Sequence, residues 1–165
     1  MAVVADELNA FEVLQVAIRI EENGVEFYRA AARILDDPKA AALLVKLSQW
    51  EQRHIQVFSD MRDRLATQGW DRGTFEPRRL EVSDAQMMAG LAVFGIQPLP
   101  WAELSGKETR REILSLALKK EKDSVIFYEG LKGFVPVPED QDIIAGVLEE
   151  ELHHVNILTS ALQQG

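Results

Sequence analysis

The stretch EQRHIQVF (51–58) returns one hundred residues later as ELHHVNIL (151–158), and both copies carry a Glu-x-x-His pair. The same offset places IEENGVEFY (20–28) on KEKDSVIFY (120–128), so one shift aligns two separate segments. We infer from this that the chain contains a duplicated unit with pseudo-twofold symmetry. Each copy spans two successive predicted helices, so the duplicated unit should be a helical hairpin.

Four long segments carry the apolar periodicity of amphipathic helices. They cover residues of about 6–35, 38–68, 105–132 and 138–162. Pro38 and Pro138 stand where the second helix of each pair would begin, and proline suits the first turn of a helix. None of the segments has the β-branched alternation of a strand, so the sequence predicts an all-α protein.

The lengths of the connections predict how the helices pair. Short loops join the first helix to the second and the third to the fourth, so each pair should form an antiparallel hairpin. Nearly forty residues separate the second and third helices, which fits a crossover along the bundle. Inside it, residues 84–94 have the pattern of a short helix that would cover the bundle or contact another subunit. We therefore expect one four-helix domain over residues 1–165.

Every predicted helix has an apolar stripe that ionisable residues interrupt near its middle. On the second helix, Glu51 and His54 stand in line with Leu47 and Phe58. Residues three or four apart share one face of a helix, so these ionisable side chains should point inward with the apolar ones. The six interrupting residues, our candidate metal ligands, are Glu21, Glu51, His54, Glu121, Glu151 and His154.

Four carboxylates that converge in an apolar core are costly unless they are paired or bind a metal. No Lys or Arg lies in the middle of any stripe to neutralise them. Two divalent cations would balance four carboxylates, and two neutral imidazoles would complete the ligand sets. Such ligands suit iron or manganese, whereas zinc tends to be tetrahedral. We expect two iron ions per chain, with manganese or a mixed pair, or a polar network without metal, as alternatives.

All three histidines of the chain follow a glutamate by three residues, and two of these pairs overlap near residue 150. Glu150 and His153 point about 100° away from Glu151 and His154 on a helix. The stripe through Glu150 and His153 is the less apolar of the two, so we assign them as flanking residues. We also expect the lysine-rich stretch 119–122 to be a solvated face.

At these residues the chain resembles the rubrerythrin-related branch of the ferritin-like di-iron carboxylate proteins. The resemblance rests on an E-x6-Y motif in the first and third helices and on the E-x-x-H motif of the second and fourth. It covers most of the chain and implies a ferritin-like four-helix bundle. It also implies that Glu51 and Glu151 bridge two metals, that Glu21 and Glu121 are terminal ligands, and that each histidine binds one metal.

Tyr28 and Tyr128, the tyrosines of the E-x6-Y motifs, lie two turns from the glutamates of their own helices. That distance, about 10.5 Å along the axis, is too long for contact within one helix. On an antiparallel neighbour, each hydroxyl could hold a ligand carboxylate by a hydrogen bond. The alternative is that both tyrosines serve only in core packing.

The resemblance implies an oxidoreductase that reduces hydrogen peroxide or O₂ at the di-iron site. One alternative is an iron-handling protein, which oxidises iron for uptake, storage or delivery. The other is a structural protein in which the metal only holds the helices together. The chain departs from typical rubrerythrins because it has no cysteine for a rubredoxin domain, which implies a separate electron donor. It also has Ser124 where the family carries a second glutamate. The resemblance further implies a homodimer.

Composition excludes several other classes of function. A net charge of −9 argues against nucleic acid or an anionic membrane as partner. Without cysteine there are no disulfides, thiolate metal sites or iron–sulfur clusters. The first residues lack a signal-peptide pattern, and the longest apolar run, 87–96, is too short to span a membrane. The expected location is the cytoplasm.

Overall fold

The computed structural model describes residues 10–67, 104–135 and 137–165. These ranges form helices and contain no strand, so the predicted all-α fold is confirmed. The expected short helix at 84–94 lies outside the described residues. The four helices are α1 (Ala10–Ile34), α2 (Pro38–Thr67), α4 (Arg110–Phe134) and α5 (Pro138–Gln163).

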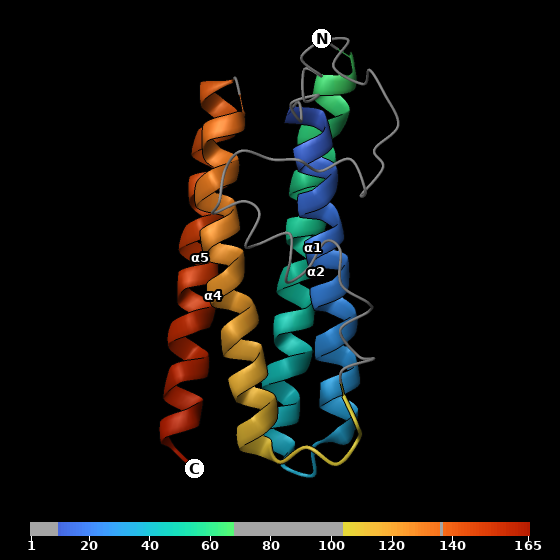
Figure 1. Cartoon of the computed structure of the whole chain (residues 1–165), viewed down its shortest axis with the longest axis vertical. Helices are drawn as coiled ribbons and strands as arrows, with labels where there is room; N and C mark the ends of the chain where they lie inside the picture. The colour runs from blue at the N-terminus through green and yellow to red at the C-terminus, as the bar shows by residue number, and fades with distance from the viewer. Residues whose placement is uncertain (1–9, 68–103, 136) are drawn as a thin grey trace, which may run out of the picture.

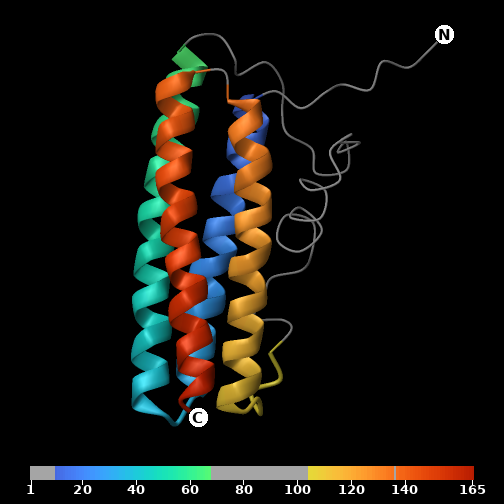
Figure 2. The same ribbon diagram turned by 90° about the vertical axis from the view of Figure 1, so that its left-hand side faces the viewer.

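The helices pack as two antiparallel hairpins that lie side by side, α1 with α2 and α4 with α5 (Figure 1). A view turned by 90° shows the contacts between the hairpins, in which α1 lies beside α4 and α2 beside α5 (Figure 2). The end of α2 and the start of α4 lie at opposite ends of the bundle, as the predicted long crossover requires. The four-helix bundle of two hairpins is thus confirmed.

The third long helix begins at Arg110, and its predicted start at residue 105 is wrong. The Glu108 carboxylate accepts hydrogen bonds from the backbone amides of Ser105 and Gly106, which hold a turn before the helix. Gly106 has a φ of 83°, a conformation that glycine adopts without strain. Thr109 then caps the helix through a reciprocal pair of hydrogen bonds with Glu112.

Ion pairs join the two hairpins at both ends of the bundle. At one end, Arg110 on α4 donates to the Asp37 carboxylate at 2.8 Å and to the carbonyl oxygen of Ala161 on α5 at 2.9 Å. Asp37 also accepts from the backbone amide of Lys39 and so caps α2. At the other end, Arg64 on α2 pairs with the buried Asp140 in the first turn of α5.

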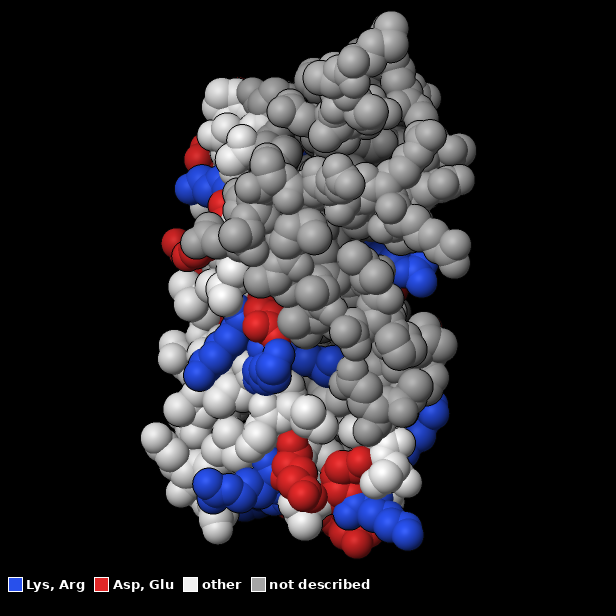
Figure 3. Space-filling view, viewed as in Figure 1, with Lys and Arg blue, Asp and Glu red and all other residues white. Residues whose placement is uncertain are grey.

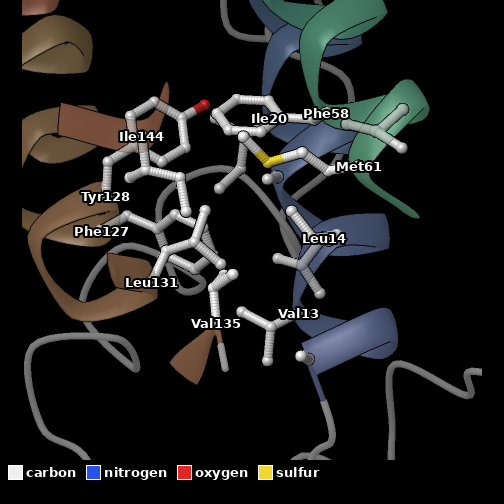
Figure 4. Packing of buried hydrophobic residues seen from close by; sticks show 14 of the residues in the cluster. Val13, Leu14, Ile20, Phe58, Met61, Phe127, Tyr128, Leu131, Val135 and Ile144 are labelled. Atoms are coloured by element: carbon white, nitrogen blue, oxygen red, sulfur yellow. The ribbon is translucent and has the colours of Figure 1, made fainter. Parts of the chain in front are cut away.

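The apolar core is divided into two clusters, one toward each end of the bundle. In the cluster near the start of α1, Leu14 and Met61 face Leu131 and Ile144 across the hairpins (Figure 4). The other cluster lies near the start of α4 and packs the apolar side chains of Phe27, Tyr28, Ala31, Leu44, Leu47, Ile113, Leu114, Ala117 and Leu158. The candidate metal ligands come between these clusters along every helix, so the polar layer has apolar packing above and below it.

The described surface carries charges of both signs. On the face shown in Figure 3, basic and acidic side chains are interspersed over the lower half of the molecule. Among the described helices, none combines the length and the apolar composition that a membrane span needs.

The cap at Thr109 gives a test of where α4 begins. Replacing Thr109 with alanine leaves the amide of Glu112 without its side-chain acceptor, so the free energy of unfolding should fall by about 1 kcal/mol. Ser105→Ala is the control, because residue 105 lies before the helix and the change should stay within about 0.5 kcal/mol. Urea unfolding of the metal-free protein measures both. A loss at Thr109 no larger than the loss at Ser105 would contradict the assignment of Thr109 as the cap of α4.

Candidate metal centre

The structure brings all six candidate ligands together in the middle of the bundle. Glu21 comes from α1 and Glu121 from α4, while α2 and α5 each supply a Glu-x-x-His pair one turn apart. Each of the six residues is no more than 3% exposed. Polar side chains of this kind are rarely buried so completely without partners, so their contacts decide what the layer does.

The six side chains form two overlapping groups, and each group could hold a metal ion. The ligand atoms within a group all lie within 4.8 Å of one another. One group is Glu21, Glu51, His54 and Glu151, and the other is Glu51, Glu121, Glu151 and His154. Glu51 and Glu151 belong to both groups, so the arrangement is two adjacent ligand sets that share two carboxylates.

Both histidines turn the same ring nitrogen toward the carboxylates. His54 Nδ1 lies 2.9 Å from a Glu151 oxygen, 3.2 Å from a Glu51 oxygen and 3.6 Å from a Glu21 oxygen. His154 Nδ1 lies 3.4 to 3.6 Å from oxygens of Glu151, Glu51 and Glu121. Each Nδ1 therefore faces both shared carboxylates and one carboxylate of its own group.

Several buried polar atoms of this layer have no hydrogen-bond partner. Within the described residues these are Glu51 Oε1, both carboxylate oxygens of Glu151, and His154 Nδ1. A buried donor or acceptor without a partner costs about 1–3 kcal/mol, and native proteins contain few of them. All of them belong to the candidate ligands, and carboxylate oxygens with imidazole nitrogens are the donors that iron and manganese accept. The residues present therefore fit a bound metal pair.

Burial and mutual repulsion favour the protonated form of two of the carboxyl groups, Glu21 and Glu151, when metal is absent. Burial and the neighbouring Glu51 raise the pKa of Glu21 well above its ordinary value. Burial and the neighbouring Glu121 raise the pKa of Glu151 to about 8. Burial also acts against ionisation of Glu121, but the neighbouring Glu151 carboxyl group and the His154 ring outweigh it and lower the pKa of Glu121. The proton of this pair thus stays on Glu151.

The histidines are also protonated at neutral pH when metal is absent. Burial lowers the pKa of His154, but the Glu121 and Glu151 carboxyl groups that face its Nδ1 outweigh burial and raise the pKa to about 12. The same balance raises the pKa of His54 far above its ordinary value. An imidazolium cannot bind a metal, so metal has to displace protons from this layer.

The two tyrosines reach across between the hairpins. The Tyr28 hydroxyl on α1 donates a hydrogen bond to the Glu121 carboxylate on α4. The Tyr128 hydroxyl on α4 donates to the Glu21 carboxylate on α1. Burial and these carboxylates raise the pKa of both phenols, so both hydroxyls keep the protons that they donate to the carboxylates. Each hairpin therefore fixes the unshared carboxylate of the other.

The two histidine rings have different neighbours beyond the six candidate ligands. His54 Nε2 lies 3.0 Å from a Glu150 carboxylate oxygen, a contact that the sequence did not reveal, since Glu150 was assigned as flanking. Trp50 stacks on the His154 ring with the centroids 4.8 Å apart. The offset of one hundred residues aligns Trp50 with Glu150, so this difference could have been read from the repeat. His153 is exposed, in keeping with its assignment as flanking.

A small hollow opens beside the ligands between α1 and α4. Gly24 and Ser124, which the repeat makes equivalent, line it together with Glu21 and Glu121, and it has room for about one water-sized molecule. Lys120 also lines it and is 6% exposed, with its ammonium group 5.0 Å from the centre of the Phe27 ring. The expectation that the whole lysine-rich stretch is solvated is therefore wrong at Lys120.

Two comparisons with known proteins match this architecture. Residues 12–77, which contain all of α2 and most of α1, match the family model described as Rubrerythrin. The chain is also similar to a solved structure from Thermotoga maritima, assigned as that of a ferritin-like diiron-carboxylate protein. The TM-score is 0.71 at 22% identity, over 95% of this chain and 96% of that one. No curated protein matches the sequence at a significant level.

These findings confirm the resemblance to the rubrerythrin-related, ferritin-like proteins. The family match falls on the first hairpin, which carries Glu21 and one Glu-x-x-His pair. At its low identity, the structural match shows the fold alone, and it extends that fold over both hairpins. The second ligand set therefore rests on the geometry of this chain.

The protons held by the metal-free layer predict how metal binding depends on pH. Glu151, with a pKa of about 8, and both histidines are protonated at neutral pH and must release protons to bind metal. Lowering the pH below about 8 should therefore weaken metal affinity, and binding at pH 7 should release protons. A pH-indicator dye in weak buffer measures the release, and titrations at several pH values measure the affinity. An affinity independent of pH, without proton release, would contradict this protonation pattern.

Proposed function

We propose that this chain is a non-haem di-iron protein of rubrerythrin-like type that binds two iron ions and reduces hydrogen peroxide or O₂. The observation that carries the proposal is the pair of overlapping ligand groups with two shared carboxylates. Two ions would give partners to the four buried polar atoms of this layer that lack them among the described residues. Two divalent ions also balance the charge of four carboxylates, which a single ion would leave half uncompensated.

The residues divide in this proposal into two sets with the same types of ligand. Glu51 and Glu151 would bridge the ions, because they alone belong to both groups. Glu21 and His54 would complete one set, and Glu121 and His154 the other. Manganese could occupy either set, since its preference for oxygen and imidazole ligands is similar to that of iron.

When bound, two ferrous ions supply the two electrons that, with two protons, reduce hydrogen peroxide to water. The chain would contribute the arrangement around them. The hollow between α1 and α4 reaches the unshared carboxylates and is small enough to favour a molecule of the size of peroxide or O₂. Tyr28 and Tyr128 hold those carboxylates in place, and the buried Lys120 also lines the hollow.

The electrons that return the iron to its ferrous state have to come from another protein or cofactor. The chain has no cysteine, so these 165 residues contain no rubredoxin-type centre. A separate electron donor is therefore part of the proposal, as are a homodimer and a cytoplasmic location. The net charge of −9 supports the expectation that neither nucleic acid nor an anionic membrane is a partner.

The test of the proposal is anaerobic loading with Fe²⁺ followed by separate mixing with hydrogen peroxide and O₂. Elemental analysis should find two iron ions per chain, and absorbance should report rapid oxidation by at least one oxidant. Saturation at one ion per chain would contradict the paired ligand groups. Two ions that neither oxidant oxidises would indicate a structural metal. Continued uptake of iron beyond two ions per chain would favour iron handling.

The hollow between α1 and α4 gives a second test, through Gly24. A methyl group at residue 24 would lie 3.5 Å from Glu51 Cγ, an ordinary contact, and would occupy part of the hollow. Gly24→Ala should therefore keep two iron ions but slow their oxidation several-fold in stopped-flow mixing.

The matched control for this variant is Gly146→Ala, where a methyl group meets no atom within 4 Å. Both changes replace a helical glycine and should raise stability by up to about 1 kcal/mol. Equal oxidation rates in the two variants would show that the oxidant does not approach between α1 and α4.

A further inference from the structure

The two halves of the ligand layer are nearly symmetric toward the centre and differ on the outside. Both histidines present Nδ1 to the shared carboxylates, so Nε2 of each ring points away from them. His54 Nε2 meets the Glu150 carboxylate at 3.0 Å. In the part of the chain that the structure describes, His154 has no carboxylate at this position and instead stacks on Trp50.

A carboxylate on the outer nitrogen changes what a histidine offers a metal. When Nδ1 binds the ion, Nε2 carries the ring proton and donates it in a hydrogen bond to the carboxylate. That hydrogen bond fixes the tautomer and the orientation of the ring, and it makes Nδ1 a stronger donor. Indole stacking on His154 restricts the orientation of the ring but withdraws no proton from Nε2.

We propose that Glu150 is a positioning residue that makes the two metal sites unequal, so that the set containing His54 binds its ion more tightly and fills first. The inference rests on the proposed function, since it requires two ions per chain. The internal repeat supplies the comparison, because residue 50 occupies the place of residue 150 and bears an indole in place of a carboxylate.

Glu150 can be replaced without damage to the core. Its side chain is 57% exposed, so truncation opens no buried cavity. Glu149 is the matched control, because it is also an exposed glutamate of α5 and lines the same surface groove beside Trp50. Removal of either residue changes the net charge equally, but only Glu150 contacts a candidate ligand.

The experiment is an anaerobic titration of the metal-free protein with Co²⁺, a spectroscopic probe that O₂-free conditions keep divalent. The wild type should bind two ions with two resolved dissociation constants. Glu150→Ala should weaken the tighter constant by about 10- to 100-fold and leave the other unchanged. Glu150→Gln, which keeps an acceptor but loses the charge, should fall between, and Glu149→Ala should match the wild type.

Proton NMR of the Co²⁺-loaded protein shows which set fills first. The exchangeable Nε2 proton of a ligand histidine is shifted by the paramagnetic ion, so full loading should give two such resonances. With one equivalent of Co²⁺, the resonance present should be the one that Glu150→Ala shifts or broadens. If that resonance appears only with the second equivalent, the assigned order is wrong.

The remaining outcomes separate this inference from the proposed function. Equal changes in both constants for Glu150→Ala, or no change in either, would overturn the inequality and leave the two-ion proposal standing. Two wild-type sites of equal affinity would do the same. Saturation of the wild type below two ions per chain would overturn both.

Discussion

The fold is organised around the repulsion of four carboxyl groups that are held within one layer of an apolar bundle. Glu21, Glu51, Glu121 and Glu151 cannot all be ionised there without compensating charge, and protons or metal ions have to supply it. This layer adds no apolar stabilisation, so the free energy of folding comes from the clusters on either side of it and the ion pairs at the two ends. The ends of the bundle therefore hold together a centre that would otherwise separate.

Much of this architecture could be predicted from the sequence, because the signals were local. The spacing of apolar residues gave four helices, and the interruption of each stripe gave six residues that the structure brings together. The start of α4 was missed, since a periodic pattern does not distinguish Ser105 in a turn from the true cap at Thr109. The side chains around both residues are polar. The turn and the helix start differ only in their hydrogen bonds, which Glu108 accepts in the turn and Glu112 accepts at the cap.

Two further misses came from contacts between hairpins, which no single helix encodes. From the sequence, Lys120 is predicted to be exposed like its neighbours Lys119 and Lys122. In the structure its ammonium group lies over the Phe27 ring of the other hairpin. Glu150 reads as a flanking residue because it is exposed on its own helix. Its contact with His54 depends on how α5 is rotated against α2. The helical periodicity of apolar residues predicts which face of a helix is buried. It does not predict which residue of a neighbouring helix an exposed side chain at the edge of that face will contact.

The crossed tyrosine hydrogen bonds have a consequence for the origin of the chain. Tyr28 donates to a carboxylate of the second hairpin and Tyr128 to one of the first, so in a lone hairpin neither the tyrosine nor the unshared glutamate has its partner. A single-hairpin ancestor would have completed the layer only by forming a dimer with an identical copy. The fraction of chains in that dimer would have depended on protein concentration. Joining the copies in one polypeptide removes that dependence, since the partner is always present. In one polypeptide the two copies can also differ from each other, as they do at positions 50 and 150, which carry a tryptophan and a glutamate.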